Sequence, residues 1–414
     1  MSKIIVQKFG GTSVGTVERI QHVARLCLHT QKSESCQLVV VVSAMGDTTD
    51  DLIDLIRQIT PSPSPREQDM VLSTGEQVSI GLLAMAIHQA GGKAQSLTGW
   101  QAGIQTEYSH GKARILEIQT DILKTRLDTG NIVIVAGFQG LAEGQITTLG
   151  RGGSDTTAVA LAVALGAERC DIYTDVDAVY TTDPRIVSEA SRLDEITYDE
   201  MLELASQGAQ VLHPRSVDTA RSHGMTLRVR SSWKPEDPGT LVREKNTMIE
   251  KQKEVRGIAL DRQQARLSIV GVPDRPGIAW SIFGKLSERG VSVDIIVQCV
   301  SHDGLTEVDF TVGRDDAQKA KTELDKIAVE IGARSTSLDK EVVKLSVVGA
   351  GMIDKPGIAA KMFRALGDNG INIQMISTSE IRVSCIVSES QGEEAVRVVH
   401  DAFELGSEVK LLAN

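Results

Sequence analysis

The stretch Lys8-Phe9-Gly10-Gly11-Thr12-Ser13 follows the apolar run Ile4-Ile5-Val6 and precedes a helical pattern from Val17 to Leu28. A β-rich run, two glycines, two hydroxyls and a helix are typical of a strand-to-helix turn whose backbone N–H groups surround an anion. Lys8 adds a positive charge, and a helix that begins near Gly15 directs its positive dipole end at the same place. An ordinary βα turn is the alternative. The stretch is neither a Walker loop nor a dinucleotide fingerprint, because G-x-x-x-x-G-K and G-x-G-x-x-G are both absent from it.

The composition limits the class of protein. A chain of 414 residues exceeds one ordinary core, so we expect two or three domains. The 41 % hydrophobic and 24 % charged residues with 37 glycines fit an α/β protein, and no run of 18 apolar residues predicts a membrane span. A net charge of −11 argues against a nucleic-acid or anionic membrane surface. The N-terminal residues do not resemble a signal peptide, so we expect a cytoplasmic protein.

The five cysteines are scattered without C-x-x-C spacing, which predicts neither a zinc site nor a disulfide framework. We therefore expect no metal bound by protein side chains alone. The cysteines are expected to be buried small apolar groups: Cys27, Cys36, Cys170, Cys299 and Cys385.

Two continuous apolar runs, Val39–Val42 and Ile132–Ala136, are typical of strands buried on both faces of a parallel sheet. The first ends at Ser43-Ala44-Met45-Gly46 and the second at Gly137-Phe138-Gln139-Gly140. Strands alternate with helical patterns, and glycine-rich or acidic loops follow the strands. This order predicts an open α/β sheet with its ligand at the carboxyl edge of the strands.

A second glycine turn, Arg151-Gly152-Gly153-Ser154-Asp155-Thr156-Thr157, precedes the apolar helix expected over Ala158–Leu165. An arginine, two glycines and an N-cap at Ser154 or Asp155 again predict an anion-binding helix start. Two glycine turns of this kind, each with hydroxyls and one basic residue, favour a functional explanation over a purely structural one.

Two further stretches carry acidic residues. Glu76 lies where a long helical pattern from Arg66 is interrupted, and the alternative for a single glutamate is a solvated helix face. Asp171–Asp175 is an expected strand that ends in an acidic turn, followed by a loop of turn formers over Asp177–Arg185.

The C-terminal part contains a repeat. Asp274-Arg-Pro-Gly-Ile-Ala279 recurs at an offset of 80 as Asp354-Lys-Pro-Gly-Ile-Ala359. Each copy has the pattern of a β-α-β-β-α-β module, in which the proline also has an ordinary role at a helix start. We place the first domain at 1–245 and the two modules at 264–338 and 341–414, with 255–260 as a candidate extra strand of the second module.

Five motifs together resemble aspartate kinase of the amino-acid kinase family, and the resemblance covers essentially the whole chain. They are Lys8–Ser13, Val42–Gly46, Ser73–Gln77, Arg151–Thr157 and Thr174–Tyr180. The resemblance implies an open, mostly parallel eight-stranded sheet between helix layers, followed by two ferredoxin-like ACT modules. It implies transfer of the ATP γ-phosphoryl group to the β-carboxylate of L-aspartate, giving 4-phospho-L-aspartate in the first step of lysine, threonine and methionine biosynthesis.

The resemblance also implies cofactors and partners. They are ATP with Mg²⁺ held mainly through the nucleotide phosphates, lysine and/or threonine as feedback inhibitors bound to the ACT modules, and a homo-oligomer or α2β2 assembly formed through those modules. Neither nucleic acid nor a membrane is an expected partner.

Carried over residue by residue, Lys8 resembles the lysine that bridges the transferring phosphoryl oxygens, and Asp155 is implied to orient it. Glu76 is implied to accept the substrate α-ammonium and Arg151 to bind a substrate carboxylate. The remaining aspartate contacts are Thr48, Gly152, Gly153 and Ser154. The nucleotide contacts are Lys8, Phe9, Gly10, Gly11, Ser43, Thr174, Asp175, Tyr180, Arg185, Gln210 and Val211. Gln210 stands where many members carry lysine, so it adds no charge to the site.

Residues of the repeat fall on the family's effector positions. The threonine-type positions are Asp274, Gly277, Ile278, Gln298, Asn372 and Ile373. The positions that receive lysine in lysine-sensitive members are Met352, Ser379 and Glu380. Packing within the module is the alternative for each of them.

The chemistry agrees with these motifs, because a carboxylate nucleophile is already ionised at neutral pH and needs no general base. None of the five motifs contains histidine. Two other functions stay open: an amino-acid kinase acting on glutamate, N-acetylglutamate or UMP, and a non-catalytic amino-acid sensor. The twin ACT repeats disfavour the first, and the intact pair Lys8 and Asp155 argues against the second.

Overall fold

The computed structural model describes residues 3–209, 211–244, 254–299, 304–352 and 355–406. The chain forms two compact units. The first comprises Met1–Val179, Arg192–Ala205 and Gln210–Thr247, and the second comprises Tyr180–Ser191, Ser206–Ala209 and Met248–Asn414.

The first unit is built on an eight-stranded sheet of order β12-β14-β13-β9-β1-β2-β6-β3, in which only the β13–β14 pair is antiparallel. The predicted open, mostly parallel sheet is therefore confirmed. Its strands are β1 (Ile4–Phe9), β2 (Gln37–Val42), β3 (Ala94–Leu97), β6 (Ile132–Ala136), β9 (Arg169–Thr174), β12 (Glu195–Ile196), β13 (Leu227–Ser231) and β14 (Thr240–Val242). Every residue of β6 is buried, as its continuous apolar run predicts.

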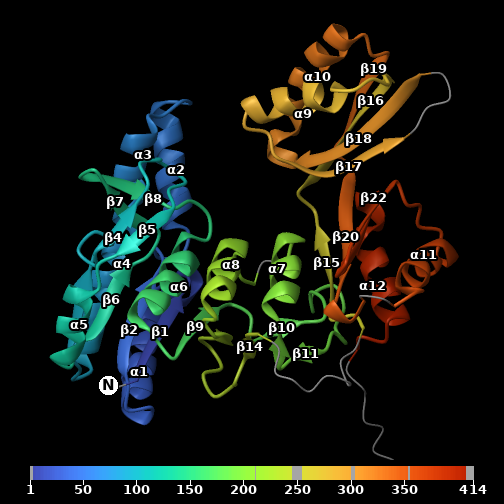
Figure 1. Ribbon diagram of the computed structural model, residues 1–414. Coiled ribbons are helices and arrows are strands. Elements are labelled where there is room, and N and C mark those ends of the chain that lie inside the picture. Colours follow the sequence, from blue (N-terminus) through green and yellow to red (C-terminus); the bar gives the residue numbers. More distant parts are fainter. Residues whose placement is uncertain (1–2, 210, 245–253, 300–303, 353–354, 407–414) are drawn as a thin grey trace, which may run out of the picture. The chain divides into compact units, whose positions relative to one another are not determined.

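Helices α1 (Val17–Ser33), α4 (Thr74–Gln89), α5 (Asp121–Asp128) and α6 (Gly153–Leu165) pack against the strands of this sheet (Figure 1). The other helices of this part of the chain are α2 (Thr48–Ile59), α3 (Pro65–Leu72), α7 (Tyr198–Ser206) and α8 (Pro214–His223), and α3 packs on β8. Side chains of α1 and α4 form one apolar core with β1, β2 and β6, which contains Val23, Leu83 and Val40. The stretch Pro65–Gln89 is long and apolar enough to cross a membrane, but half of its apolar window is buried inside the protein, as in a core helix.

Two smaller sheets lie outside the two modules in the described part of the chain. One has the order β5-β4-β7-β8, with β4 (Ile104–Thr106), β5 (Ile115–Ile118), β7 (Gln139–Ala142) and β8 (Gln145–Thr148). The other pairs β10 (Val179–Tyr180) with β11 (Arg192–Leu193).

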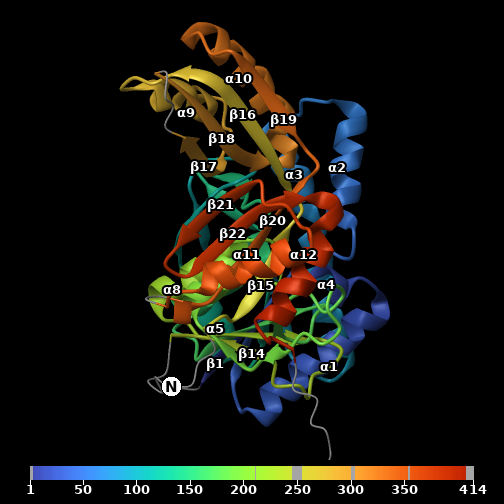
Figure 2. The same ribbon diagram turned by 90° about the vertical axis from the view of Figure 1, so that its right-hand side faces the viewer.

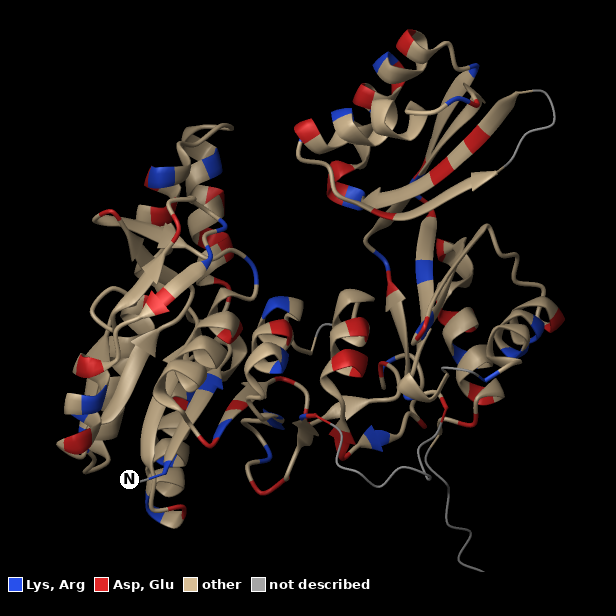
Figure 3. Cartoon of the chain, in the orientation of Figure 1, with Lys and Arg blue, Asp and Glu red and all other residues tan. Residues whose placement is uncertain are grey.

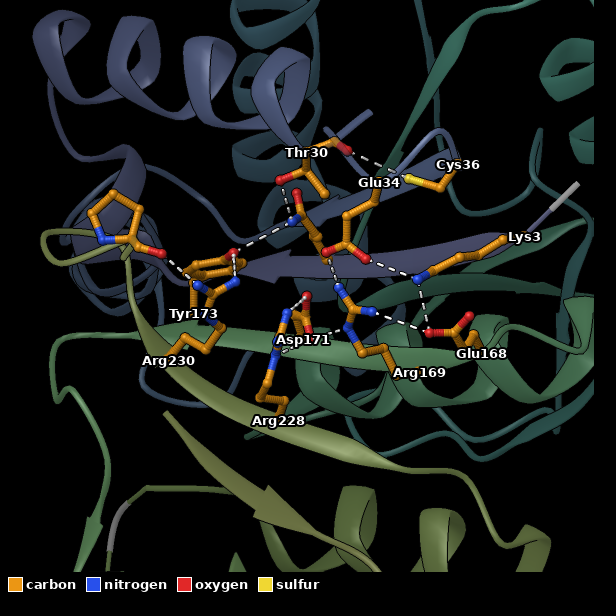
Figure 4. Close-up of polar contacts among 12 residues, drawn as sticks. Lys3, Thr30, Glu34, Cys36, Glu168, Arg169, Asp171, Tyr173, Arg228 and Arg230 are labelled. Carbon is orange, nitrogen blue, oxygen red and sulfur yellow. Dashed lines mark hydrogen bonds and ion pairs between the residues drawn. The ribbon is translucent and has the colours of Figure 1, made fainter. Parts of the chain in front are cut away.

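A buried ion-pair network lies among β9, β13 and α1 (Figure 4). Asp171 of β9 is fully buried and accepts hydrogen bonds from Arg169 (3.0 Å) and Arg228 (2.9 Å). Arg169 also pairs with Glu34, whose other oxygen accepts from Lys3 at 2.9 Å. Each buried charge has an opposite charge beside it, which is the condition for keeping ions inside a protein.

The second unit contains both predicted modules. The first has β16 (Gln264–Pro273), α9 (Ile278–Glu288), β17 (Val293–Cys299), β18 (Leu305–Gly313), α10 (Ala317–Ile331) and β19 (Ser335–Asp339), with sheet order β17-β18-β16-β19. The second has β20 (Val342–Val348), α11 (Ile358–Asp368), β21 (Met375–Ser379), β22 (Arg382–Ser388) and α12 (Gly392–Ala402). Its fourth strand is β15 (Gly257–Asp261), which precedes the first module in the chain and pairs antiparallel with β20. Figures 1 and 2 show α11 and α12 side by side on one face of this sheet.

Charged residues of both signs are interspersed over the helices (Figure 3), whereas the neighbouring central strands β2 and β6 carry none. Four cysteines are buried as predicted, but burial of Cys299 is a wrong prediction, because it is exposed on the edge strand β17. A strand at the edge of a sheet has a neighbouring strand on one side only, so fewer side chains surround its residues than in a central strand.

Candidate active site

The first glycine turn sits at the carboxyl end of β1, against the loop that follows β2. Gly46 donates its backbone N–H to the Gly11 carbonyl at 3.1 Å. A Cβ added to Gly11 would lie 2.9 Å from the carbonyl oxygen of Ala44, so no larger residue fits there without a shift. The two loops are therefore in direct contact at the carboxyl edge of the sheet, where the sequence predicts the ligand.

The helix after this turn begins where the helical pattern of the sequence predicts. Gly11–Val14 form a short 3₁₀ turn, and α1 starts at Val17, two residues after Gly15. Thr16 caps the helix by accepting a hydrogen bond from the backbone N–H of Arg19 at 3.3 Å. A threonine at the N-cap satisfies N–H groups that a helix start at Gly15 would leave open.

Lys8 and Asp155 bring the two glycine turns together. Lys8 Nζ lies 2.7 Å from Asp155 Oδ1, and their side chains are only 11 % and 13 % exposed. The contact is a close ion pair between two largely buried side chains. A carboxylate in this position holds the ammonium at the end of β1 and leaves its N–H groups available to a ligand.

The second turn differs from the prediction in its cap. Gly152, not Ser154 or Asp155, is the N-cap of α6, and its φ of 66° is the left-handed conformation that favours glycine. A Cβ there would lie 2.1 Å from Cγ of His213, so the position accepts no side chain. Ser154 and Asp155 occupy the first turn of α6, where an acidic side chain also interacts favourably with the helix dipole. Burial lowers the pKa of His213, which packs on the turn as a neutral ring.

Glu76 is buried, so the solvated-face alternative is wrong. The residue is only 3 % exposed, and its Oε1 accepts a hydrogen bond from the backbone N–H of Ala44 at 3.1 Å. Oε2 is buried and has no hydrogen-bond partner in the described part of the chain. Burial raises the pKa of Glu76 to about 7, although hydrogen bonds from its own N–H and that of Ala44 oppose this effect. A buried carboxylate with one free oxygen is suited to a cationic ligand.

The other residues predicted to contact aspartate lie around these two turns. Arg151 is exposed beside Gly152, and Gly153 and Ser154 are buried at the start of α6. Ser154 packs so tightly against the chain after β6 that a Cβ on Gly137 would lie 2.6 Å from its Oγ. Thr48 begins α2 and donates its hydroxyl to the Met45 carbonyl at 2.6 Å.

The residues predicted to contact the nucleotide are divided between the units. Phe9 stacks on Tyr173 with ring centroids 4.6 Å apart, and Gly10 donates its N–H to the Tyr173 carbonyl at 3.3 Å. Ser43 donates its N–H to the Phe9 carbonyl at 3.1 Å. The other described residues of this group in the first unit are Lys8, Gly11, Thr174, Asp175 and the half-buried Val211.

Tyr180 and Arg185 belong to the second unit. Tyr180 packs against the apolar core of the second module, and Arg185 pairs with Asp183 at 2.8 Å. Gln210, and Asp354 of the repeat, lie outside the described residues.

The comparisons with known proteins identify the family of the chain. Residues 3–231 match the model of the amino acid kinase family, and residues 266–329 and 345–403 each match a model of the ACT domain. The aspartokinase of Bacillus sp. (strain MGA3) is 52 % identical over 409 residues, which are 98 % of this chain and 99 % of that protein. The aspartate kinase of Pseudomonas putida is 52 % identical over 97 % of this chain and 98 % of that protein. The chain belongs to the aspartokinases of the amino acid kinase family.

A solved structure of another aspartokinase has the same fold. E. coli aspartokinase III in complex with aspartate and ADP (R-state) aligns with a TM-score of 0.78 at 28 % identity, over 97 % of this chain and 99 % of that chain. The chain is thus an ATP-dependent kinase with an aspartokinase fold. This result argues against the alternative of a non-catalytic amino-acid sensor.

The ACT modules of this aspartokinase place the predicted effector residues in a few regions. Gly277, with φ of 89°, caps α9, and Ile278 is buried behind it. Gln298 is exposed on β17, whose Ile295 shares an apolar cluster with Met375 of the second module. The remaining predicted positions are the exposed Asp274, Asn372, Ser379 and Glu380, the half-buried Ile373 and the buried Met352.

Sequence reasoning missed two buried polar residues, Asp69 and Gln139. Asp69 of α3 is fully buried and accepts hydrogen bonds from Thr148 Oγ1 (2.6 Å), His110 (2.8 Å) and the backbone N–H of Gly111 (3.1 Å). Gln139 of β7 is also fully buried. The only signal for Gln139 is its place in the glycine-rich loop three residues after the buried strand β6, and Asp69 lies in a helix without any motif.

Proposed function

We propose that the chain transfers the γ-phosphoryl group of ATP to the β-carboxylate of L-aspartate and so forms 4-phospho-L-aspartate, the first step of lysine, threonine and methionine biosynthesis. One observation carries this proposal: the Lys8–Asp155 ion pair joins a phosphate-type glycine turn to a second turn that carries Arg151. Nearby, Glu76 keeps one buried carboxylate oxygen free.

Each group then has a distinct task. Lys8 neutralises charge on the phosphoryl oxygens as they move from donor to acceptor, and Asp155 holds its ammonium in place. The N–H groups of the turn around Gly10 and Gly11 cradle the phosphates. Glu76 receives the α-ammonium of aspartate, and the Arg151 guanidinium binds a carboxylate. Thr48 and the turn Gly152–Ser154 complete the aspartate pocket.

Mg²⁺, which supplies additional positive charge at the phosphates, fits a site of this composition. The described residues contain no group of three or more His, Cys, Asp or Glu side chains arranged to hold a metal ion. We therefore assign the Mg²⁺ ligands mainly to the nucleotide phosphates, with Asp175 at the carboxyl end of β9 as the nearest acidic candidate of the predicted nucleotide group.

Trapping of the product tests the reaction. Hydroxylamine converts an acyl phosphate to a hydroxamate, so we expect a coloured iron–hydroxamate complex with ATP and aspartate. Glutamate and N-acetylglutamate should give none, and UMP should not be phosphorylated. Equal product with glutamate or N-acetylglutamate, or turnover of UMP, would assign the chain to a different amino-acid kinase reaction.

We also propose feedback inhibition by lysine and/or threonine at the ACT modules of a cytoplasmic homo-oligomer or α2β2 assembly. Support comes from the two ACT matches and from E. coli aspartokinase III, which has been solved in complex with lysine and aspartate (T-state) and aligns with a TM-score of 0.73 at 28 % identity. Initial rates measured against lysine and threonine, singly and together, test this proposal. A rate that neither amino acid lowers would refute it.

A further inference from the structure

The helix that carries Glu76 is interrupted at a single residue, Ser73. α3 ends at Leu72 and α4 begins at Thr74, whereas the sequence predicts a longer interruption. Ser73 is fully buried, and its N–H continues the pattern of α3 by donating to the Asp69 carbonyl at 3.0 Å. The interruption therefore has a fixed geometry rather than being a loose connection.

Two side-chain amides hold the carbonyl of Ser73. Gln139 Nε2 donates to it at 2.8 Å, and Gln77 Nε2 donates at 3.2 Å. Gln77 belongs to α4 itself, so its bond is local. Gln139 belongs to β7, 66 positions away in the sequence, and its bond ties the helix to the sheet.

Only one end of the buried Gln139 amide has a hydrogen-bond partner among the described residues. The residue is 0 % exposed, and Oε1 has no hydrogen-bond partner within the described ranges. Since the Ser73 carbonyl only accepts, Nε2 must face it, and Oε1 is left unsatisfied. An unsatisfied buried carbonyl lowers stability relative to an apolar side chain of similar volume. Packing alone therefore does not explain an amide at this position.

The first turn of α4 tolerates little movement. A Cβ on Gly75 would lie 2.8 Å from Cβ of Ala44, so the helix backbone is in close contact with the loop after β2. That contact allows Glu76 Oε1 to accept the Ala44 N–H at 3.1 Å. A displacement of the helix start by a fraction of an ångström would break this bond and redirect the free oxygen.

We propose that Gln139 is a positioning residue for the substrate. By holding the Ser73 carbonyl it fixes the first turn of α4, and so directs Oε2 of Glu76 at the α-ammonium of aspartate. The inference rests on the proposed function, in which Glu76 binds that ammonium. Gln139 itself need not touch the substrate.

The test is Gln139→Met in the full chain, because methionine keeps the volume but donates no hydrogen bond. We expect the KM for aspartate to rise about tenfold, while kcat and the KM for ATP stay within about threefold. Succinate, which is aspartate without its α-ammonium, serves as a competitive inhibitor, and its inhibition constant should change less than twofold. A residue that merely supports the fold would not separate these two ligands.

Gln7→Met is the matched control. Gln7 is likewise 0 % exposed, donates from Nε2 to Thr30 at 3.1 Å and leaves Oε1 without a partner in the described chain. Its bonds lie at α1 and Tyr173 rather than at α4. The KM for aspartate should stay within twofold in this variant.

Two results would overturn the inference. One is an unchanged KM for aspartate in a folded Gln139→Met protein, and the other is an equal loss of affinity for aspartate and for succinate. If the methionine variant does not fold, Gln139→Leu is measured in the same way. Glu76→Gln is measured in parallel to separate this inference from the proposed function. If Glu76→Gln does not weaken aspartate binding relative to succinate binding, the assignment of Glu76 as the ammonium site is wrong. If it does and Gln139→Met does not, only the role of Gln139 is wrong.

Discussion

Replacing Glu76 by glutamine should stabilise the ligand-free protein at alkaline pH, although it weakens aspartate binding. Burial raises the pKa of Glu76 from its ordinary value of 4.5 to about 7. At about 1.4 kcal/mol for each pH unit between these values, ionising the buried group costs on the order of 3 kcal/mol. Glutamine resembles the protonated acid, since it keeps the acceptor for the Ala44 N–H and cannot ionise.

The direction in which stability changes with pH follows from proton linkage. The folded protein binds the Glu76 proton more tightly than the unfolded chain does, so the stability from this group is fully present below pH 4.5 and is lost as the pH rises through about 7. Glu76→Gln removes that dependence. The free energy of unfolding of the variant should therefore equal that of the parent near pH 4.5 and exceed it by about 3 kcal/mol at pH 8.

Urea unfolding at several pH values, followed by tryptophan fluorescence, measures this difference. Trp280 lies in the second unit, so a Trp280→Phe background makes the signal report the first unit, which contains Trp100 and Trp233. Glu117→Gln, at an exposed position of β5, is the control and should show no such pH-dependent gain. Saturating aspartate should reverse the order, because it binds the parent more tightly. A variant less stable than the parent at pH 8, or an equal difference at pH 5 and pH 8, would refute the reasoning.

Four further results are expected. Lys8→Ala should lower kcat on the order of 10²-fold or more with little change in the KM for aspartate, since it acts on charge that migrates during transfer; near-normal kcat in steady-state assays would contradict its role. Arg151→Ala should raise the KM for aspartate and hardly change that for ATP, and equal losses would indicate a misfolded or mistaken pocket. Arg169 lowers the pKa of Glu34 to about 2, so Glu34→Gln should destabilise the protein at neutral pH, with a deficit in melting temperature that shrinks as the pH falls from 4.5 toward 2. Gln298→Ala and Asn372→Ala should relieve threonine inhibition with uninhibited kcat within roughly twofold, and unchanged threonine curves for both would reject this repeat as the threonine site.

The elements that were predictable from sequence are those whose pattern is local. The strand β6 is apolar at every position, and such a run can be buried only between two layers of helices. The repeat at Asp274–Ala279 and its copy likewise predict α9 and α11 from a proline near a helix start, although each proline stands one residue before the glycine N-cap rather than at N1.

What the sequence does not reveal depends on contacts between distant segments. Ser154 and Asp155 are better N-cap residues than glycine, yet Gly152 takes the cap because His213 occupies the space that a side chain would need. The sequence around Glu76 is compatible with a surface residue, but in the structure the loop at Ala44 lies against its side chain. Tertiary packing overrides local preference at both places, and both places lie at the site.

The order of strands in the second unit has a consequence for regulation. Because β15 precedes the first module and completes the sheet of the second, the second module is not contiguous in sequence, and the first module is inserted between its strands β15 and β20. Lys344 of β20 is 2 % exposed and pairs with Asp261 of β15 at 3.8 Å and with Asp294 of β17, so one buried ammonium binds carboxylates from both sheets. Separating the sheets would take Asp294 away from the buried ammonium and leave it only Asp261 of its own sheet, and breaking a buried ion pair costs on the order of a few kcal/mol. The coupling free energy between allosteric sites is typically about 1 to 3 kcal/mol. An amino acid that shifts β17 therefore moves the second module with it rather than pulling the two sheets apart.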